Sequence, residues 1–260
     1  MRGLARAQAL AGADGTAADA AQADLTQADD TLSAVATVVS RIQQLATQAA
    51  NATLSDPQRA AIGKEVAALH NNLVALANTR DANGNALFGG AGAGPAYTLD
   101  AAGNANYAGS AAAQSVTLGP GLSVTRSLTG PEFLNYTSGG TSGDLLALTK
   151  ALGDALQASG GGQAPSGAQA AAQAALDPLS AATEALTTAQ AVIGARLSWL
   201  DTTTTIHSQL AEQRSEAQGT IGEADAATAI SRLQQTMTAL QASQASFAKL
   251  ASLNLFDLIR

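Results

Sequence analysis

The chain has 260 residues and a mass of 25.7 kDa, and 46% of its residues are hydrophobic although only 3% are aromatic. Alanine therefore supplies much of the apolar content, which favours helices that pack closely over a thick globular core. A net charge of −7 with scattered basic residues argues against nucleic acid and acidic membranes as partners. The absence of cysteine excludes disulfides, thiolate catalysis and cysteine-based zinc sites.

A heptad pattern beginning at Leu25 predicts a long helix that ends near residue 52. Its apolar and small residues are separated alternately by three and four positions, as in helices that pack side by side. Before this pattern, Gly12 and Gly15 indicate a loop instead of an apolar helix. The positions of the seam are Leu25, Ala28, Leu32, Val35, Val39, Ile42, Ala46 and Ala49.

A second helix is predicted from Ser55 to about Arg80. Ser55 is suited to cap it, with Gln58 at the matching position of a capping box and Pro57 in the first turn. Residues 81–84, Asp-Ala-Asn-Gly, predict a turn after it. The apolar stripe of this helix consists of Ile62, Val66, Leu69, Leu73 and Leu76.

Residues 87–167 differ in character, because they are rich in glycine and contain short alternating segments. Two hairpins are predicted, one pairing residues 96–99 with 105–107 and one pairing residues 115–118 with 122–125. A helix follows at about 144–158, and then a glycine-rich connector. Because the helical seams must pack on one another, we expect this β-rich insert to project from one end of the helices.

The longest helix is predicted over residues 168–218, with Pro178 either kinking it or marking its start. Gly219 and Gly222 are expected to interrupt it, so that a last amphipathic helix begins near Glu223. Five residues recur at intervals of seven along the long helix and form its seam, with Leu197 and Leu210 widening the stripe. These five are Leu179, Leu186, Ile193, Leu200 and His207.

The last helix carries an apolar stripe that no other predicted element is available to cover. A terminus this apolar is rarely left in water, so we interpret the stripe as an interface for assembly or for a chaperone. The expected interface residues are Ile230, Leu233, Met237, Leu240, Phe247, Leu250, Leu253, Leu255 and Phe256.

Taken together, the segments predict a mostly α protein, a long antiparallel helical rod with a small β-rich inserted domain at one end. We expect a discontinuous rod domain of residues 17–86 and 168–218. The insert comprises residues 87–167, and residues 219–260 form a C-terminal assembly helix.

The sequence contains no pattern typical of catalysis, so we expect no catalytic residue, metal or cofactor and no enzyme activity. His70 and His207 lack a second ligand at metal spacing and are interpreted as packing histidines. The acidic pairs Asp29–Asp30 and Glu223 with Asp225 are typical of solvated helix surfaces. The glycine-rich residues 89–94 lack the Lys-Ser/Thr that a phosphate-binding loop requires.

Several segments, in the right order, resemble the flagellin and flagellar hook-associated protein family. Residues 49–59, Ala-Ala-Asn-Ala-Thr-Leu-Ser-Asp-Pro-Gln-Arg, are similar to the flagellin-class segment A-x-N-G-T-L-S-D-x-D-R. Residues 76–84 and 87–89 resemble, more specifically, the members that join the hook to the filament. Further similarities lie in residues 118–121 with 130–133, in 193–196 and 239–243, and in the Leu-Phe-Asp-Leu ending at 255–258.

The resemblance implies a structural subunit that forms a ring at the hook–filament junction. Its implied partners are copies of itself, the second junction protein (FlgK), flagellin and a flagellar export chaperone. The implied location is extracellular, on the flagellum, reached by type III export without a cleaved signal peptide. Members of the family usually begin with an N-terminal arm that pairs with the C-terminal helix, and residues 1–15 carry no such apolar helix.

Two alternatives remain open. A flagellin, the filament subunit, is favoured by the terminal Arg260, whereas residues 76–89 and 255–258 favour the junction protein. An unrelated coiled-coil adaptor or secreted effector would share the helical seams but not the ordered family motifs.

Overall fold

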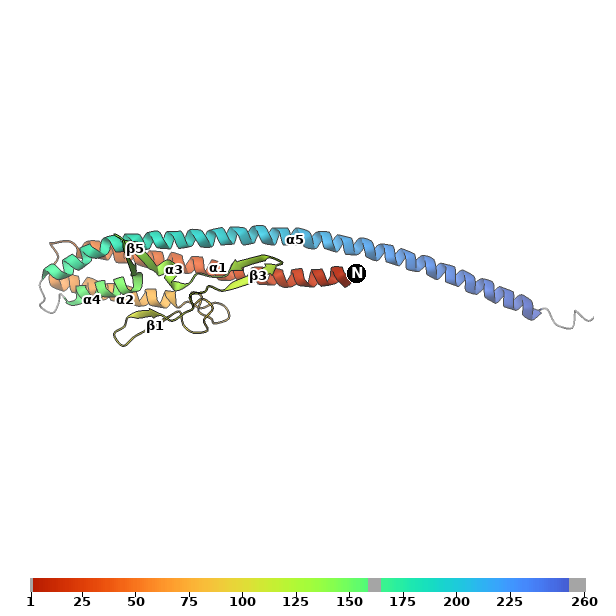
Figure 1. Cartoon of the computed structure of the whole chain (residues 1–260), viewed down its shortest axis with the longest axis horizontal. Helices are drawn as coiled ribbons and strands as arrows, with labels where there is room; N and C mark the ends of the chain where they lie inside the picture. Colours follow the sequence, from red (N-terminus) through yellow and green to blue (C-terminus); the bar gives the residue numbers. More distant parts are fainter. Residues whose placement is uncertain (1, 159–164, 253–260) are drawn as a thin grey trace, which may run out of the picture. The chain divides into compact units, whose positions relative to one another are not determined.

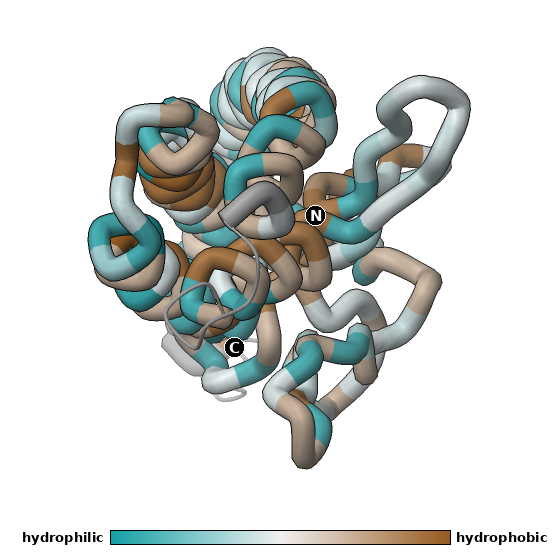
Figure 2. Tube along the Cα trace, turned by 90° about the vertical axis from the view of Figure 1, so that its left-hand side faces the viewer, coloured by the Kyte–Doolittle hydropathy of each residue, from teal (hydrophilic) through white to brown (hydrophobic). Residues whose placement is uncertain are grey.

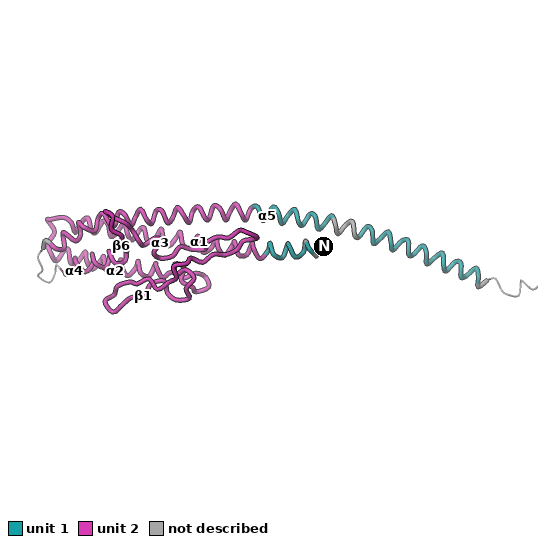
Figure 3. Tube along the Cα trace, in the orientation of Figure 1, with its two compact units in different colours: residues 1–12, 206–260 teal, residues 13–205 magenta. Residues whose placement is uncertain are grey.

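The computed structural model describes residues 2–158 and 165–252 (Figure 1). Contacts group the chain into two compact units, residues 13–205 and residues 1–12 with 206–260 (Figure 3). The helices are α1 (Arg2–Ala49), α2 (Asp56–Ala77), α3 (Gly130–Leu134), α4 (Leu145–Ala158) and α5 (Pro165–Ser252). The strands are β1 (Tyr97–Leu99), β2 (Ala105–Tyr107), β3 (Ser115–Gly119), β4 (Leu122–Thr125), β5 (Asn135–Ser138) and β6 (Thr141–Asp144).

The core of unit 13–205 is the seam between the antiparallel helices α1 and α5. Every position of the seam predicted on α1 is buried, and Leu179, Leu186, Ile193 and Leu200 are buried on α5. Small residues such as Ala182 alternate with these larger ones, so the two helices approach closely. In the end-on view of Figure 2, apolar turns of neighbouring helices gather toward the middle of the bundle. The long heptad helices predicted from the sequence are confirmed.

The loop predicted before Leu25 is wrong, because α1 begins at Arg2 and continues through Gly12 and Gly15. A Cβ atom at either glycine would meet nothing within 4 Å, so both occupy open positions on the helix surface. Each glycine costs about 0.5–1 kcal/mol relative to alanine. The many alanines around them, the best helix formers, offset that cost.

The interruption predicted at Gly219 and Gly222 is also wrong, because α5 is continuous from Pro165 to Ser252. The helix also continues through Pro178, which neither starts nor ends it. Proline removes one backbone hydrogen bond from a helix. Burial of Leu179 and partial burial of Leu176 on either side of Pro178 stabilise the helix across that gap.

Arg59 organises the turn between α1 and α2. Its side chain is buried and donates hydrogen bonds to the carbonyl oxygens of Ala49 at 3.2 Å and Asn51 at 2.9 Å. Carbonyl groups at the end of a helix have no partner within that helix, so Arg59 supplies the missing donors. The predicted cap of α2 is confirmed, since Ser55 N donates to Gln58 Oε1 at 2.9 Å. The family-like segment 49–59 is therefore a structural turn.

The segment after α2 is also structural. The Asn78 amide donates to Tyr97 O at 3.0 Å and accepts from Tyr97 N at 2.9 Å, which ties the end of α2 to β1. Asp81 Oδ1 accepts from the backbone N–H groups of Asn83 and Asn85. Burial alone would raise the pKa of Asp81, but the hydrogen bonds from Asn85 and Asn83 outweigh it and lower that pKa. The predicted turn at residues 81–84 is thus fixed by its own carboxylate.

The described part of the insert contains three separate two-stranded antiparallel sheets. Both predicted hairpins are confirmed: β1 pairs with β2, and β3 pairs with β4. Helix α3 and the hairpin β5–β6 were not predicted. Their signals are a capping box, in which Thr129 N donates to Glu132, and the glycines 139 and 140, whose φ angles of 57° and 78° form the turn.

The predicted fold class, mostly α with long antiparallel helices and a small β-rich insert, is confirmed. The sequence led us to expect that the insert projects from one end of the helices. Instead it lies against the flanks of α1 and α5 and is bonded to both. Arg126 forms an ion pair with Asp24 of α1, and Arg196 Nη1 of α5 donates to Ser127 O at 2.9 Å. The buried rings of Phe88 and Phe133 lie 4.7 Å apart in the same core. These contacts hold the insert against the helices although its sequence is rich in glycine.

Helix α4 packs against α2 with very little space between the two backbones. A Cβ atom on Gly63 would lie 2.8 Å from Gln157 N and 2.8 Å from Leu156 Cβ. Gly153 faces the backbone of Ala67 at ordinary contact distance. Glycine at position 63 is therefore required by the close crossing of the helices, not by its backbone conformation.

A buried histidine also lies in the α2–α4 contact. His70 Nδ1 is 3.0 Å from Thr149 Oγ1, whose hydroxyl donates to Leu146 O. The threonine oxygen is therefore the acceptor, and Nδ1 carries the proton. Within the described residues, the buried Nε2 has no partner. Burial, followed by the charge of Lys150, lowers the pKa of His70, while Asp154 acts in the opposite direction.

We predict that Gly63→Ala lowers the free energy of unfolding by about 1–3 kcal/mol, because the new methyl group overlaps the backbone of α4. Gly194→Ala is the matched control, since that helical glycine has nothing within 4 Å of an added Cβ. The control should raise the free energy of unfolding by about 0.5–1 kcal/mol. Urea unfolding measures both changes, and equal stabilisation by the two substitutions would contradict the close crossing.

We predict that Arg59→Ala lowers the free energy of unfolding by about 2 kcal/mol, because the carbonyl groups of Ala49 and Asn51 lose their charged donor. Arg41→Ala serves as a comparison, since the Arg41–Glu65 ion pair has side chains 46% and 44% exposed. Such an exposed pair contributes about 0–1 kcal/mol. Urea unfolding measures both losses of stability. A smaller decrease in the free energy of unfolding for Arg59→Ala than for Arg41→Ala would refute the capping role.

We predict that acid weakens the fold through His70. Its pKa in the folded chain lies below the ordinary 6.5. The histidine of the unfolded chain therefore binds a proton more readily than that of the folded chain. The free energy of unfolding consequently falls as the pH drops below about 6.5. His70→Asn keeps a donor toward Thr149 but does not titrate, so it should flatten the dependence of unfolding free energy on pH between about 7 and 5. An unchanged pH dependence in the variant would exclude His70 as the source.

Candidate assembly surface

The predicted interface lies on the part of α5 that belongs to unit 1–12 and 206–260. Residues 226–250 are all exposed, including the large apolar side chains among them. The exposed fractions of the predicted residues are 56% for Ile230, 60% for Leu233, 53% for Met237, 58% for Leu240, 75% for Phe247 and 69% for Leu250. The other predicted residues, Leu253, Leu255 and Phe256, lie outside the described residues.

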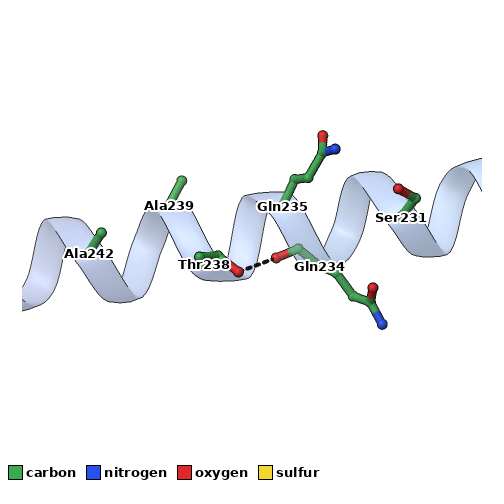
Figure 4. Close-up of a pocket in the computed structure, with 6 residues that line it drawn as sticks. All are labelled: Ser231, Gln234, Gln235, Thr238, Ala239 and Ala242. Atoms are coloured by element: carbon green, nitrogen blue, oxygen red, sulfur yellow. Dashed lines mark hydrogen bonds between the residues drawn. The ribbon is translucent and has the colours of Figure 1, made fainter.

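The exposed apolar residues follow one face of the helix, because steps of three and four residues return to the same side every two turns. The opposite face is small and polar. Figure 4 shows that face with Ser231, Gln234, Gln235 and Thr238 next to two alanines, and Thr238 Oγ1 donates to Gln234 O at 2.9 Å. The helix is therefore amphipathic, with a definite side for a partner. We call Ile230, Leu233, Met237, Leu240, Phe247 and Leu250 the apolar stripe.

Charge contributes little to this surface. Arg232 is the one charged residue in the sequence between positions 226 and 248. Burying a large aliphatic or aromatic side chain contributes about 1.5–3 kcal/mol, before the costs of association are subtracted. A nearly neutral stripe with several such side chains can bind another apolar helix without electrostatic repulsion. The stripe is suited to helix–helix assembly, not to the recognition of a charged ligand.

The buried seam ends earlier along α5 than the heptad pattern predicted. Leu200 is buried, but Ile206 and Leu210 are 50% and 40% exposed. His207, expected to continue the seam, is half-buried, and its Nδ1 has no partner within the described residues. The sequence spacing alone did not reveal this boundary, because the seven-residue interval continues beyond it.

Few groups suited to catalysis or metal binding lie close together among the described residues. They contain no cluster of three or more His, Cys, Asp or Glu side chains that could hold a metal ion. Asp29 and Asp30 lie on α1, whereas the side chains of Glu223 and Asp225 lie outside the described set. A surface depression between α1 and α5 is lined mainly by hydroxyl and amide groups, with Asp177 as its acid. No described helix has the length and apolar character needed to cross a bilayer.

Comparison with known proteins agrees with the resemblance seen in the motifs. Residues 4–93 match the family described as the bacterial flagellin N-terminal helical region. A 62-residue segment is 39% identical to flagellar hook-associated protein 3 of Escherichia coli K12. That segment covers 24% of this chain and spans 20% of that protein.

Solved structures of hook-associated proteins share the fold. A putative flagellar hook-associated protein from Vibrio parahaemolyticus aligns with a TM-score of 0.73 at 21% identity, covering 84% of this chain and 93% of the other. Hook-associated protein 3 from Legionella pneumophila aligns with a TM-score of 0.75 at 15% identity, covering 85% and 98%. FlgL from Xanthomonas campestris aligns with a TM-score of 0.67 at 20% identity, covering 74% and 92%.

These findings confirm the resemblance drawn from the sequence. Identities this low establish a shared fold, while the matched N-terminal segment adds a direct relationship in sequence. Residues 4–93 thus resemble the flagellin N-terminal helical region, in a chain that shares its fold with FlgL-type hook-associated proteins.

Proposed function

We propose that this chain is a structural subunit of the bacterial flagellum that joins the hook to the filament. The observation that carries the proposal is the apolar stripe, exposed at 53–75% on one face of a long helix. The relative that matches in sequence is a hook-associated protein, and the fold is that of FlgL-type structures. A mechanical role fits a chain whose described residues offer an assembly surface but no cluster of chemical groups.

The proposed mechanism is helix packing. Unit 13–205 is held by its own buried seam, so its fold does not depend on the stripe. The stripe is then free to bury its side chains against helices of neighbouring subunits, at about 25 cal/mol per Å² of apolar surface. Residues 219–260 act as the assembly helix in this proposal, although α5 is continuous through their start.

The proposed partners are copies of this chain in a ring, the second junction protein (FlgK), flagellin, and an export chaperone that covers the stripe before assembly. The proposed location is the extracellular flagellum, reached by export without a cleaved signal peptide. An exposed stripe supports the chaperone in particular, because apolar surface of this kind promotes aggregation when nothing covers it.

A flagellin is the second candidate, because the matched N-terminal helical region is described as that of flagellin. The two roles differ in one observable property. A filament subunit polymerises with itself into long filaments, whereas a junction subunit stops at a layer on the hook end. Electron microscopy of the purified chain under conditions that polymerise flagellin separates them.

The direct test mixes the purified chain with purified hooks carrying the FlgK-type protein, followed by pelleting and electron microscopy. We expect capture at hook ends that is lost when residues 219–260 are removed. Capture that survives this truncation would contradict the role of the assembly helix. Hooks that bind neither form would contradict the junction function and favour the filament subunit or an unrelated adaptor.

We predict that Leu240→Asp leaves unit 13–205 folded but weakens capture at hook ends at least tenfold, because burying a leucine contributes about 1.5–3 kcal/mol. Thr238→Asp is the matched control, since it adds the same charge on the opposite, polar face of the helix. The control should bind like the unsubstituted chain. Pelleting with hooks measures both, and equal capture of the two variants would show that the stripe is not the contact.

A further inference from the structure

A second apolar surface lies within unit 13–205, between the edge of β4 and α5. It is a depression of about 420 Å³ whose walls include Ser123 and Val124 of β4 and Val192, Arg196 and Trp199 of α5. Val192 and Trp199 are each 38% exposed, so both present apolar surface to the depression. The spacing of 192, 196 and 199 places them on one face of the helix. We call this depression the tryptophan groove.

The tryptophan groove has an apolar floor and one positive charge. Arg196 Nη1 donates to Ser127 O at 2.9 Å, which fixes the guanidinium at the rim. Among the residues that the structure describes, no carboxylate pairs with Arg196, whereas Arg126 nearby is paired with Asp24. Tryptophan and arginine are the residue types that contribute most to protein interfaces. The groove therefore suits a ligand with an apolar side chain next to a carboxylate.

The hairpin β1–β2 presents such a pair of groups. Leu99, at the end of β1, is 53% exposed, and Asp100 follows it in the turn. Asp100 Oδ1 accepts from the backbone N–H groups of Ala102 at 2.9 Å and Asn104 at 2.8 Å, which makes the turn rigid. The side-chain hydrogen bond from Asn104 is the main cause that lowers the pKa of Asp100, so the carboxylate is charged at neutral pH. Leu99 and Asp100 form what we call the hairpin knob.

The hairpin knob and the tryptophan groove cannot meet within one chain. Figure 1 shows the β1–β2 hairpin on the side of unit 13–205 opposite to α5. A contact that joins two different surfaces of identical subunits is heterologous, and it produces a ring when its rotation closes. We propose that the hairpin knob of one copy docks in the tryptophan groove of the next, with Leu99 against Trp199 and Asp100 near Arg196. The closed ring rests on the proposed function, whereas the contact itself does not.

Site-directed cross-linking tests this contact, because the chain contains no cysteine of its own. Ala101→Cys labels the exposed turn beside the knob, and Ser123→Cys labels the exposed rim of the groove. Neither substitution removes Leu99, Asp100, Arg196 or Trp199. The two purified variants, one carrying a mass tag, are mixed at high concentration with a short bismaleimide. The tag distinguishes the mixed dimer from dimers of one variant.

We predict that the mixed dimer forms in higher yield than either dimer of a single variant. Adding Leu99→Ser to the Ala101→Cys chain should lower that yield about tenfold, which corresponds to about 1.4 kcal/mol of lost binding free energy. Asp100→Asn keeps the oxygen that the turn needs but removes the charge, so it should lower the yield at low salt. Gln173→Cys, an exposed position elsewhere on α5, is the control partner for random collision.

A mixed yield no higher than that with Gln173→Cys, or one unaffected by Leu99→Ser, would overturn the proposed contact. Capture at hook ends, measured separately on the unlabelled chain, keeps the two proposals distinguishable. Capture without the mixed dimer overturns the contact and leaves the junction role. The mixed dimer without capture supports a contact between copies and removes the junction role.

Discussion

The buried seam between α1 and α5 is the interaction on which the rest of this structure depends. On α5 its larger side chains alternate with alanines from Leu179 to Ile193, so two long helices approach closely along unit 13–205. Few aromatic residues are available to build a thick core, and alanine contributes little area per residue. Stability must therefore come from the length of the seam. A protein built in this way is suited to bearing load along its helices more than to enclosing a ligand.

The other elements are bonded to this seam by a small number of polar contacts. Arg59 closes the α1–α2 turn, Asn78 connects α2 to β1, and the Asp24–Arg126 pair holds the insert against α1. Each of these side chains satisfies backbone or charged groups that would otherwise lose their hydrogen bonds on burial. Several of the motifs that carry the family resemblance thus have structural roles. These motifs fix the turns of the chain, whereas the surfaces that we propose for assembly consist of exposed apolar residues.

The sequence predicted the longer helices and two of the hairpins because their signals are periodic and local. The positions of the α1 seam from Leu25 to Ala49 are all buried, as the spacing of three and four residues required. Glycine was misleading at positions 12, 15, 219 and 222, because a single glycine costs less than a long alanine-rich helix gains. The hairpin β5–β6 lacks β-branched or aromatic alternation in Thr141–Asp144, so its sequence gave little signal.

Surfaces were harder to predict than elements. The apolar stripe was predicted because it is one continuous pattern on one helix. The tryptophan groove was not, since it combines residues of β4 and α5 that are far apart in the sequence. Its Arg196 and Trp199 follow a core residue, Ile193, and spacing alone cannot tell a buried face from a groove wall. The close crossing at Gly63 was missed for the same reason, because it depends on α4.

The central claim is that the apolar stripe of α5 becomes buried when the chain assembles at the end of a hook. Single cysteines introduced one at a time from Ile230 to Phe247, in a chain with none of its own, can be tested for reaction with a maleimide before and after assembly. We predict protection at the stripe positions, Ile230, Leu233, Met237, Leu240 and Phe247, with continued reaction at Ser231, Thr238 and Ala242. Equal reactivity on both faces of the assembled helix would contradict it.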